Sequence, residues 1–198
     1  MLVADADRWN VNIHFHDLLV DAVSGADAVL DVGCGEGMLA RRLRTRSSAV
    51  TGIDLDEPGI DSARAQSPDG EIDYVHADFL DHPFEPASFD GIVSVATLHH
   101  MDNVAALTRM KELLRPGGTL AVVGLARNEL PADALGFAGS IAAFAWYRTF
   151  RKRWDHPSPI VWPPPQTYRQ VREIAEGVLP GVRFRRYLMP RYSIVWTK

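Results

Sequence analysis

The sequence predicts an α/β fold: a doubly wound sheet of about seven strands, mostly parallel, that ends in an antiparallel C-terminal hairpin. Between residues 28 and 125, short apolar runs alternate with amphipathic stretches, which is the pattern of parallel strands joined by crossover helices. Near the C-terminus, two β-prone runs, 182–188 and 192–196, lie on either side of Met189-Pro190-Arg191 and predict the hairpin. The parallel strands are expected at residues 28–32, 48–54, 72–77, 89–95 and 118–125.

Helices are expected before, between and after these strands. The first four are expected near residues 8–23, 37–45, 58–66 and 103–114. A last helix begins at Thr167, which forms a capping-box pattern with Gln170. The length of 198 residues, with 46% hydrophobic side chains, is enough for one domain with a full core, so residues 1–198 are expected to form a single domain.

The most informative stretch is the turn between the first expected strand and the helix that follows it. It reads Val-Gly-Cys-Gly-Glu-Gly over residues 32–37 and contains three alternating glycines, Gly33, Gly35 and Gly37. Glycine allows a positive φ angle and removes the Cβ atoms that would hold a ligand away from the backbone. This turn is therefore expected to bind a nucleotide-type cofactor.

The glycine spacing distinguishes two classes of cofactor. The dinucleotide fingerprint G-x-G-x-x-G needs a third glycine at position 38, where this chain has Met38. Residues 30–37, Leu-Asp-Val-Gly-Cys-Gly-Glu-Gly, instead resemble the first motif of the class I S-adenosylmethionine-dependent methyltransferases. An NAD(P)-binding oxidoreductase stays an alternative, which Met38 and the C-terminal hairpin disfavour.

Later segments resemble further landmarks of the same family, in the family's order. Residues 49–54 form an apolar run that ends in Asp54, about 20 residues past the glycine loop, where the family has an acid that binds ribose. The other similar segments are Tyr74–Phe79, Phe89–Ser94 and Leu113–Leu120. The resemblance spans residues 29–125 and implies a Rossmann-like sheet of the methyltransferase kind.

The resemblance implies methyl transfer from S-adenosyl-L-methionine, with S-adenosyl-L-homocysteine as the product. Transfer of a methyl group from a sulfonium is an in-line displacement, which depends on alignment and needs a base only for a protonated nucleophile. The acceptor is expected to be a small, partly apolar molecule, and attack by oxygen, nitrogen or carbon stays open. A noncatalytic S-adenosylmethionine-binding protein is the other alternative.

The family's cofactor roles carry over to several residues of this chain. Asp54 is expected to bind the ribose hydroxyls, Asp78 to face the adenine amino group, and Asp31 to lie near the methionyl ammonium. Asp56 either joins Asp54 at the ribose or caps the next helix. The full cofactor-binding set that the resemblance implies is Asp31, Gly33, Cys34, Gly35, Gly37, Asp54, Leu55, Asp78, Phe79 and Ser94.

Two adjacent histidines, His99 and His100, follow the fourth expected strand, where the family has its active-site edge. An unperturbed histidine has a pKa of about 6.5, so either ring could act as a general base or orient the acceptor. The alternative is a structural role, in which the rings cap the next helix or hydrogen-bond the loop. His99 and His100 are the expected catalytic residues.

Two segments are expected to cover the cofactor. Residues 1–26 would place an N-terminal helix over it, and residues 126–165 form an insertion with an apolar stretch of 14 residues, 134–147. A helix here is interpreted as a lid, a dimer contact or an interfacial membrane helix, because the stretch is too short to span a bilayer. The expected acceptor contacts are His14, Phe144, Trp146 and Tyr147.

Composition limits the expected partners and location. The net charge of −4, from 21 basic and 25 acidic residues, gives no indication of nucleic-acid binding. The single cysteine, Cys34, excludes an internal disulfide; it is interpreted as a spacer or a redox site, and no metal site is expected. The first residues lack the pattern of a signal peptide, so a cytoplasmic monomer or homodimer without stable membrane insertion is expected.

Overall fold

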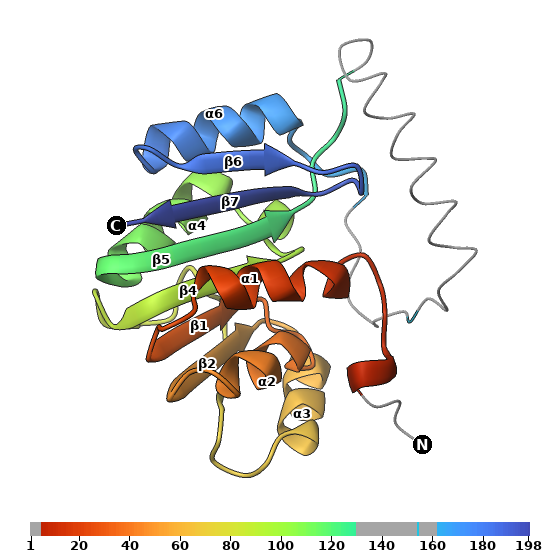
Figure 1. The fold of residues 1–198 in the computed structure, drawn as a ribbon, viewed down its shortest axis with the longest axis vertical. Helices are drawn as coiled ribbons and strands as arrows, with labels where there is room; N and C mark the ends of the chain where they lie inside the picture. The colour runs from red at the N-terminus through yellow and green to blue at the C-terminus, as the bar shows by residue number, and fades with distance from the viewer. Residues whose placement is uncertain (1–4, 130–153, 155–161) are drawn as a thin grey trace.

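The computed structural model describes residues 5–129, 154 and 162–198. It shows a seven-stranded sheet in the order β3-β2-β1-β4-β5-β7-β6 (Figure 1). The strands are β1 (Ala28–Val32), β2 (Ala49–Asp54), β3 (Asp73–His76), β4 (Phe89–Val95), β5 (Leu114–Gly124), β6 (Arg183–Arg186) and β7 (Tyr192–Thr197).

The first five strands run parallel, and β7 runs antiparallel to both of its neighbours, β5 and β6. The predicted fold class, a mostly parallel sheet with antiparallel C-terminal strands, is therefore confirmed. Strand β5 is longer than the expected 118–125. It begins at Leu114 because this residue pairs with Phe89, before the register shifts ahead of Gly91.

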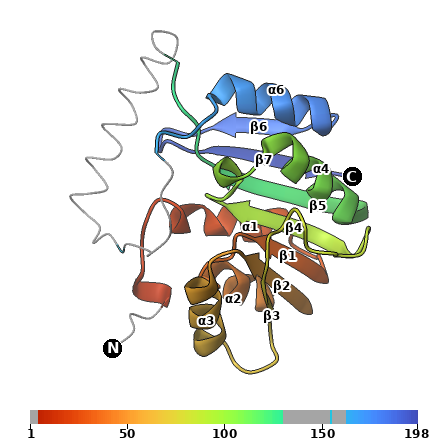
Figure 2. The ribbon, with the colours of Figure 1, turned by 180° about the vertical axis from the view of Figure 1, so that it is seen from behind.

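Five α-helices cover the two faces of the sheet in the described part of the chain. They are α1 (His16–Ala22), α2 (Met38–Arg44), α3 (Glu57–Gln66), α4 (Asn103–Leu113) and α6 (Tyr168–Val178). Helices α1 to α3 lie on one face, and α4 and α6 lie on the other (Figures 1 and 2). Because strand side chains alternate, Val29 packs in the core under α1 to α3, whereas Leu30 packs under α4 and α6.

The N-terminal helix is shorter than the expected 8–23. Helix α1 begins only at His16, after the short 3₁₀ segments η1 (Asp5–Asp7) and η2 (Ile13–Phe15). The side chain of Asn10 explains the late start. Its Oδ1 accepts hydrogen bonds from the backbone N–H groups of Asn12 and Ile13, both at 2.9 Å, and so stabilises a turn where the helix was expected.

The order of the strands marks the position of a ligand site. Strands β2 and β3 lie on one side of β1, and β4 and β5 lie on the other, so the order reverses between β1 and β4. Doubly wound sheets bind ligands at the carboxyl edge, beside such a reversal. The loops that follow β1 and β4, residues 33–37 and 96–97 with η3 (Leu98–His100), flank this point.

Most of the expected lid lies outside the described residues, which omit 130–153 and 155–161. Phe144, Trp146 and Tyr147 fall in these ranges, so the lid and its acceptor contacts stay predictions. In the ranges that are described, no helix has both the length and the apolar character needed to cross a membrane.

The capping box at the start of α6 is confirmed and gives a test of the fold. Thr167 Oγ1 accepts the Gln170 N–H at 3.3 Å, and Gln170 Oε1 accepts the Thr167 N–H at 2.9 Å. We expect Thr167→Ala to lower the free energy of unfolding by about 1 kcal/mol, because two helix-end donors lose this reciprocal arrangement. Urea denaturation measures the change. The exposed Ser48→Ala is the control, with a change below about 0.5 kcal/mol; an equal effect of both substitutions would contradict the role of the cap.

Candidate active site

The three loop glycines all have positive φ angles: +76° at Gly33, +51° at Gly35 and +77° at Gly37. A Cβ at Gly33 would lie 2.0 Å from Thr97 Oγ1, and a Cβ at Gly37 would lie 2.3 Å from Tyr74 Oη. These two glycines are therefore required by the packing of the protein itself, as well as by the backbone conformation. Gly35, between them, has the same left-handed backbone that favours glycine.

Asp54, at the end of β2, holds this loop in place. Its Oδ2 accepts the Gly35 N–H at 2.7 Å, and its Oδ1 accepts the Asp56 N–H at 2.9 Å. The Gly33 and Cys34 N–H groups donate to the Ile53 carbonyl at 2.8 and 3.2 Å. A carboxylate can accept about four hydrogen bonds, so Asp54 keeps acceptor capacity for hydroxyl groups of a ligand.

The residues after β2 and β3 lie at the same edge of the sheet. Asp56 caps α3 by accepting the Gly59 N–H at 3.1 Å, which is the capping role of the two that the sequence left open. Leu55 has 66% of its surface exposed. Asp78 is exposed and accepts the Leu80 N–H at 2.8 Å, whereas Phe79 is buried.

Asp31, near the end of β1, is fully buried, and among the described residues neither of its carboxylate oxygens has a hydrogen-bond partner. Burial, together with the negative charge of Asp54, raises the pKa of this carboxyl to about 8. A buried carboxylate without a partner is costly, and a cation beside it would favour its ionised form. The surroundings of Asp31 therefore suit the binding of a positively charged ligand.

Cys34, within the loop, and Ser94, on β4 beside it, both have side chains that contact the protein itself. The Ser94 hydroxyl is buried and donates to the Val32 carbonyl at 2.8 Å, which ties β4 to the end of β1. Burial raises the pKa of the Cys34 thiol well above its ordinary value, so the thiol stays protonated. A protonated, buried thiol fits the interpretation of Cys34 as a spacer.

The two histidines lie in η3, directly after β4, with their ring centroids 4.1 Å apart. His99 is buried, and burial lowers its pKa to about 4, with the positive charges of His100 and Arg191 acting in the same direction. Among the described residues its Nδ1 has no hydrogen-bond partner. His100 is exposed; burial of part of its ring lowers its pKa, and the charge of Asp54 opposes this shift.

The backbone at this edge is strained next to the histidines. Ala96 has a φ angle of +55°, which a residue with a Cβ rarely adopts. Its N–H donates to the Val123 carbonyl at 2.8 Å, which fixes the unusual conformation. Such strain is concentrated at functional sites, and here it sets the direction in which the chain leaves β4 toward His99.

A buried ion pair that the sequence analysis missed connects the N-terminal segment to the glycine loop. Arg8 Nη1 lies 2.6 Å from Glu36 Oε1, and Arg8 Nη2 donates to Gln66 Oε1 at 3.0 Å. The Arg8 guanidinium also lies 4.7 Å from the ring centroid of Trp154, and the backbone N–H of Trp154 donates to the Trp9 carbonyl at 2.8 Å. The only sequence signal was a charged residue, Glu36, between two loop glycines.

Comparisons with known proteins agree with this geometry. Residues 30–122 match the family model described as a methyltransferase domain. A protein of Mycobacterium tuberculosis strain H37Rv, named an uncharacterized methyltransferase, is 40% identical over 191 residues, which cover 95% of this chain and 96% of that protein. The chain belongs to the class I S-adenosylmethionine-dependent methyltransferases.

This methyltransferase is also similar to more distant proteins, two of them with solved structures. A solved S-adenosylmethionine-dependent methyltransferase from Mesorhizobium loti aligns with a TM-score of 0.66 at 18% identity, over 96% of this chain and 98% of that one. The [4+2]-cyclase SpnF aligns with a TM-score of 0.69 at 15% identity, over 99% and 84%. At these identities the similarity shows the fold alone. An O-methyltransferase of Aspergillus nomiae is 38% identical over 103 residues, 49% of this chain and 46% of its own length.

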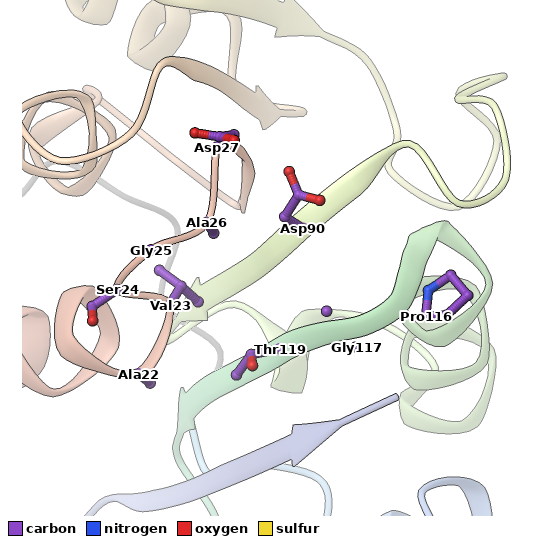
Figure 3. A pocket seen from close by; sticks show the side chains of 11 residues that line it. Ala22, Val23, Ser24, Gly25, Ala26, Asp27, Asp90, Pro116, Gly117 and Thr119 are labelled. Carbon is purple, nitrogen blue, oxygen red and sulfur yellow. The ribbon is translucent and has the colours of Figure 1, made fainter.

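The pocket in Figure 3 lies at the amino edge of the parallel strands, opposite the carboxyl edge that holds the glycine loop and the histidines. Residues 22–27, ahead of β1, line it together with Asp90 and residues 116–119. Its central acid, Asp90, is already engaged: it accepts the Ala28 N–H at 2.9 Å and pairs with Arg115 at 2.8 Å. This pocket is therefore separate from the glycine loop and from the histidines.

The N-terminal histidines of the methyltransferase differ in their surroundings. His14 is exposed and lies edge-on to Phe15, with 5.1 Å between the ring centroids. His16 is buried, and burial lowers its pKa to about 3. In the described ranges, no cluster of three or more histidine, cysteine or acidic side chains is arranged to hold a metal ion.

Asp31 gives the ligand-free protein a pH dependence of stability with a definite sign. Between pH of about 4 and about 8, the unfolded chain has lost the carboxyl proton while the folded chain keeps it, so the free energy of unfolding falls as pH rises. We expect Asp31→Asn to remove this pH-dependent loss of stability. The free energy of unfolding of Asp31→Asn minus that of wild type should therefore increase from pH 4 to pH 8, by at most about 1.4 kcal/mol per pH unit.

Urea denaturation of both proteins across this pH range measures the effect, and the contributions of the histidines cancel in the difference. The exposed Asp69→Asn serves as the control for replacing an acid with its amide. A pH-independent difference between wild type and Asp31→Asn would show that Asp31 is ionised in the folded protein, contrary to this account.

Proposed function

We propose that this protein transfers a methyl group from S-adenosyl-L-methionine to a small, partly apolar acceptor and releases S-adenosyl-L-homocysteine. The observation that carries the proposal is the buried, unpartnered carboxylate of Asp31 at the carboxyl edge of β1, directly ahead of the glycine loop. The methionyl end of the cofactor carries an ammonium. This group would be the positively charged partner that Asp31 lacks in the described structure.

The remaining cofactor contacts are proposed along the same edge. Asp54 would accept hydrogen bonds from the ribose hydroxyls, with an orientation already fixed by the Gly35 and Asp56 N–H groups. The adenine would lie between the exposed Leu55 and the segment of Asp78 and Phe79. Gly33, Cys34, Gly37 and Ser94 would act by shaping the loop, since their side-chain positions are occupied by contacts within the protein.

The bound cofactor supplies a methyl group on a sulfonium, and the chain's residues supply alignment. Holding two reactants in line can be worth an effective molarity of about 10⁵ M or more, so no strong base is required. His99 is neutral above a pH of about 4 and could accept a hydrogen bond from an acceptor hydroxyl. Its low pKa makes it a weak base, so we propose that it orients the acceptor.

His100 is the better candidate for accepting a proton. It is exposed; burial of part of its ring lowers its pKa, but the negative charge of Asp54 opposes this shift. A base would be needed only if the acceptor atom carries a proton when it attacks. The similarity to an O-methyltransferase over half of the chain supports an oxygen acceptor, for which one of the two histidines would be required.

The second candidate function is a protein that binds the cofactor and performs no methyl transfer. The similarity in fold to SpnF, which is named a cyclase, supports this candidate, because the same architecture there carries a name other than methyltransferase. The two candidates differ in turnover and share cofactor binding. Calorimetric titration with S-adenosylmethionine and with NAD tests the shared part: tight binding of the first alone is expected, and binding of NAD alone would overturn the proposal.

Asp54 provides the sharpest mutational test of the cofactor site. We expect Asp54→Ala to weaken S-adenosylmethionine binding by about 1.5–3 kcal/mol, the range for a hydrogen bond to a charged group, which is a roughly 10- to 150-fold rise in Kd. Calorimetric titration measures the affinity. The matched control is Asp73→Ala, which removes an exposed acid from the opposite end of β3 and should leave the affinity unchanged. An unchanged Kd in Asp54→Ala would rule out the ribose role.

A further inference from the structure

Arg191, in the loop between β6 and β7, carries a charge that no acid in the described part of the chain neutralises. Its Nε and Nη2 donate to Asn12 Oδ1 at 3.0 and 2.8 Å, and its Nη1 donates to the Pro190 carbonyl at 2.8 Å. All of these acceptors are uncharged. By contrast, Arg8 faces the carboxylate of Glu36.

The sheet places Arg191 at the edge that holds the candidate active site. Tyr192, the next residue, pairs with Gly124 at the carboxyl end of β5, and Ser193 pairs with Val123, which in turn pairs with Val95 of β4. The chain that leaves β4 leads directly to His99. The positive charge of Arg191 acts on that ring and lowers its pKa.

An unneutralised guanidinium in such a place is costly. Arg191 is partly buried, and burial lowers its pKa to about 10. Its hydrogen bonds do tether the β6–β7 loop to the N-terminal segment, but they use only one N–H of each Nη. The second N–H on each Nη remains, and two N–H groups of one guanidinium match the two oxygens of a carboxylate.

We propose that Arg191 binds a carboxylate of the methyl acceptor, so that the substrates of this protein are organic acids. The inference rests on the proposed function and narrows its substrate class. His99, with its unpartnered Nδ1, lies in the same region and offers a further polar contact to the bound acid. Together, the arginine and the histidine would hold the acceptor in one orientation.

The carboxylate of the cofactor is the other group that Arg191 could bind, and the sheet order favours the acceptor. Asp31, the proposed partner of the methionyl ammonium, is on β1, whereas Arg191 adjoins β7, three strand spacings or about 14 Å away. The ammonium and carboxylate of the cofactor are attached to the same carbon atom. A cofactor anchored at Asp31 therefore keeps its carboxylate near β1.

The test uses the full-length protein saturated with S-adenosylhomocysteine, titrated calorimetrically with hexanoate and with hexanamide, its uncharged counterpart of similar shape. We expect wild type to bind hexanoate at least tenfold more tightly than hexanamide. Arg191→Gln, which removes the charge but keeps a donor for Asn12, should lose this preference. Arg183→Gln removes an exposed arginine from the far end of the same hairpin and should keep it.

The outcomes separate the possible roles of Arg191. Equal affinity for both probes in wild type, binding of neither, or a preference that survives in Arg191→Gln would overturn the proposal. An affinity for S-adenosylhomocysteine that falls tenfold or more in Arg191→Gln would assign the arginine to the cofactor, and would also overturn it. If Arg191→Gln does not fold, Arg191→Lys replaces it, and a preference as large as that of wild type would contradict bidentate binding. Failure of wild type to bind S-adenosylhomocysteine at all would instead contradict the proposed function.

Discussion

The hydrogen bond from the Gly35 N–H to the Asp54 carboxylate joins the glycine loop to the end of the neighbouring strand. The loop has few side chains with which to hold a shape, and its positive φ angles are accessible because its alternate residues are glycines. Asp54 and the Ile53 carbonyl together receive three backbone N–H groups of the loop. The start of α2 and the position of Glu36, which Arg8 contacts, both follow from this fixed loop.

Two acids at adjacent strand ends have different surroundings. Asp54 accepts two backbone N–H groups, whereas Asp31 lies in the core and neither of its carboxylate oxygens has a hydrogen-bond partner in the described part of the chain. The charge of Asp54 adds to the cost of ionising Asp31, so the pair accommodates one negative charge more readily than two. A cationic ligand at Asp31 would favour its ionised form. Arg191 is the opposite case: it is a cation that no acid in the described part of the chain neutralises.

The sequence predicted the features that depend on neighbours along the chain. Apolar runs marked the strands, the glycines marked the loop, and Thr167 with Gln170 marked a helix start, because each pattern acts within a few residues. The Arg8–Glu36 pair and the Arg191–Asn12 contact join residues 28 and 179 positions apart, and no local pattern predicts them. The early part of the expected N-terminal helix was wrong for a local reason, the hydrogen bonds of the Asn10 side chain, which compete with helical ones.

The central claim is that a buried, protonated Asp31 becomes ionised when the cofactor ammonium binds. Calorimetric titration with S-adenosylmethionine at pH 7, repeated in buffers of different ionisation enthalpy, measures the number of protons released. Because the pKa of Asp31 is about 8 without ligand, the account predicts the release of close to one proton by wild type and close to none by Asp31→Asn. Tight binding by wild type without proton release would contradict it.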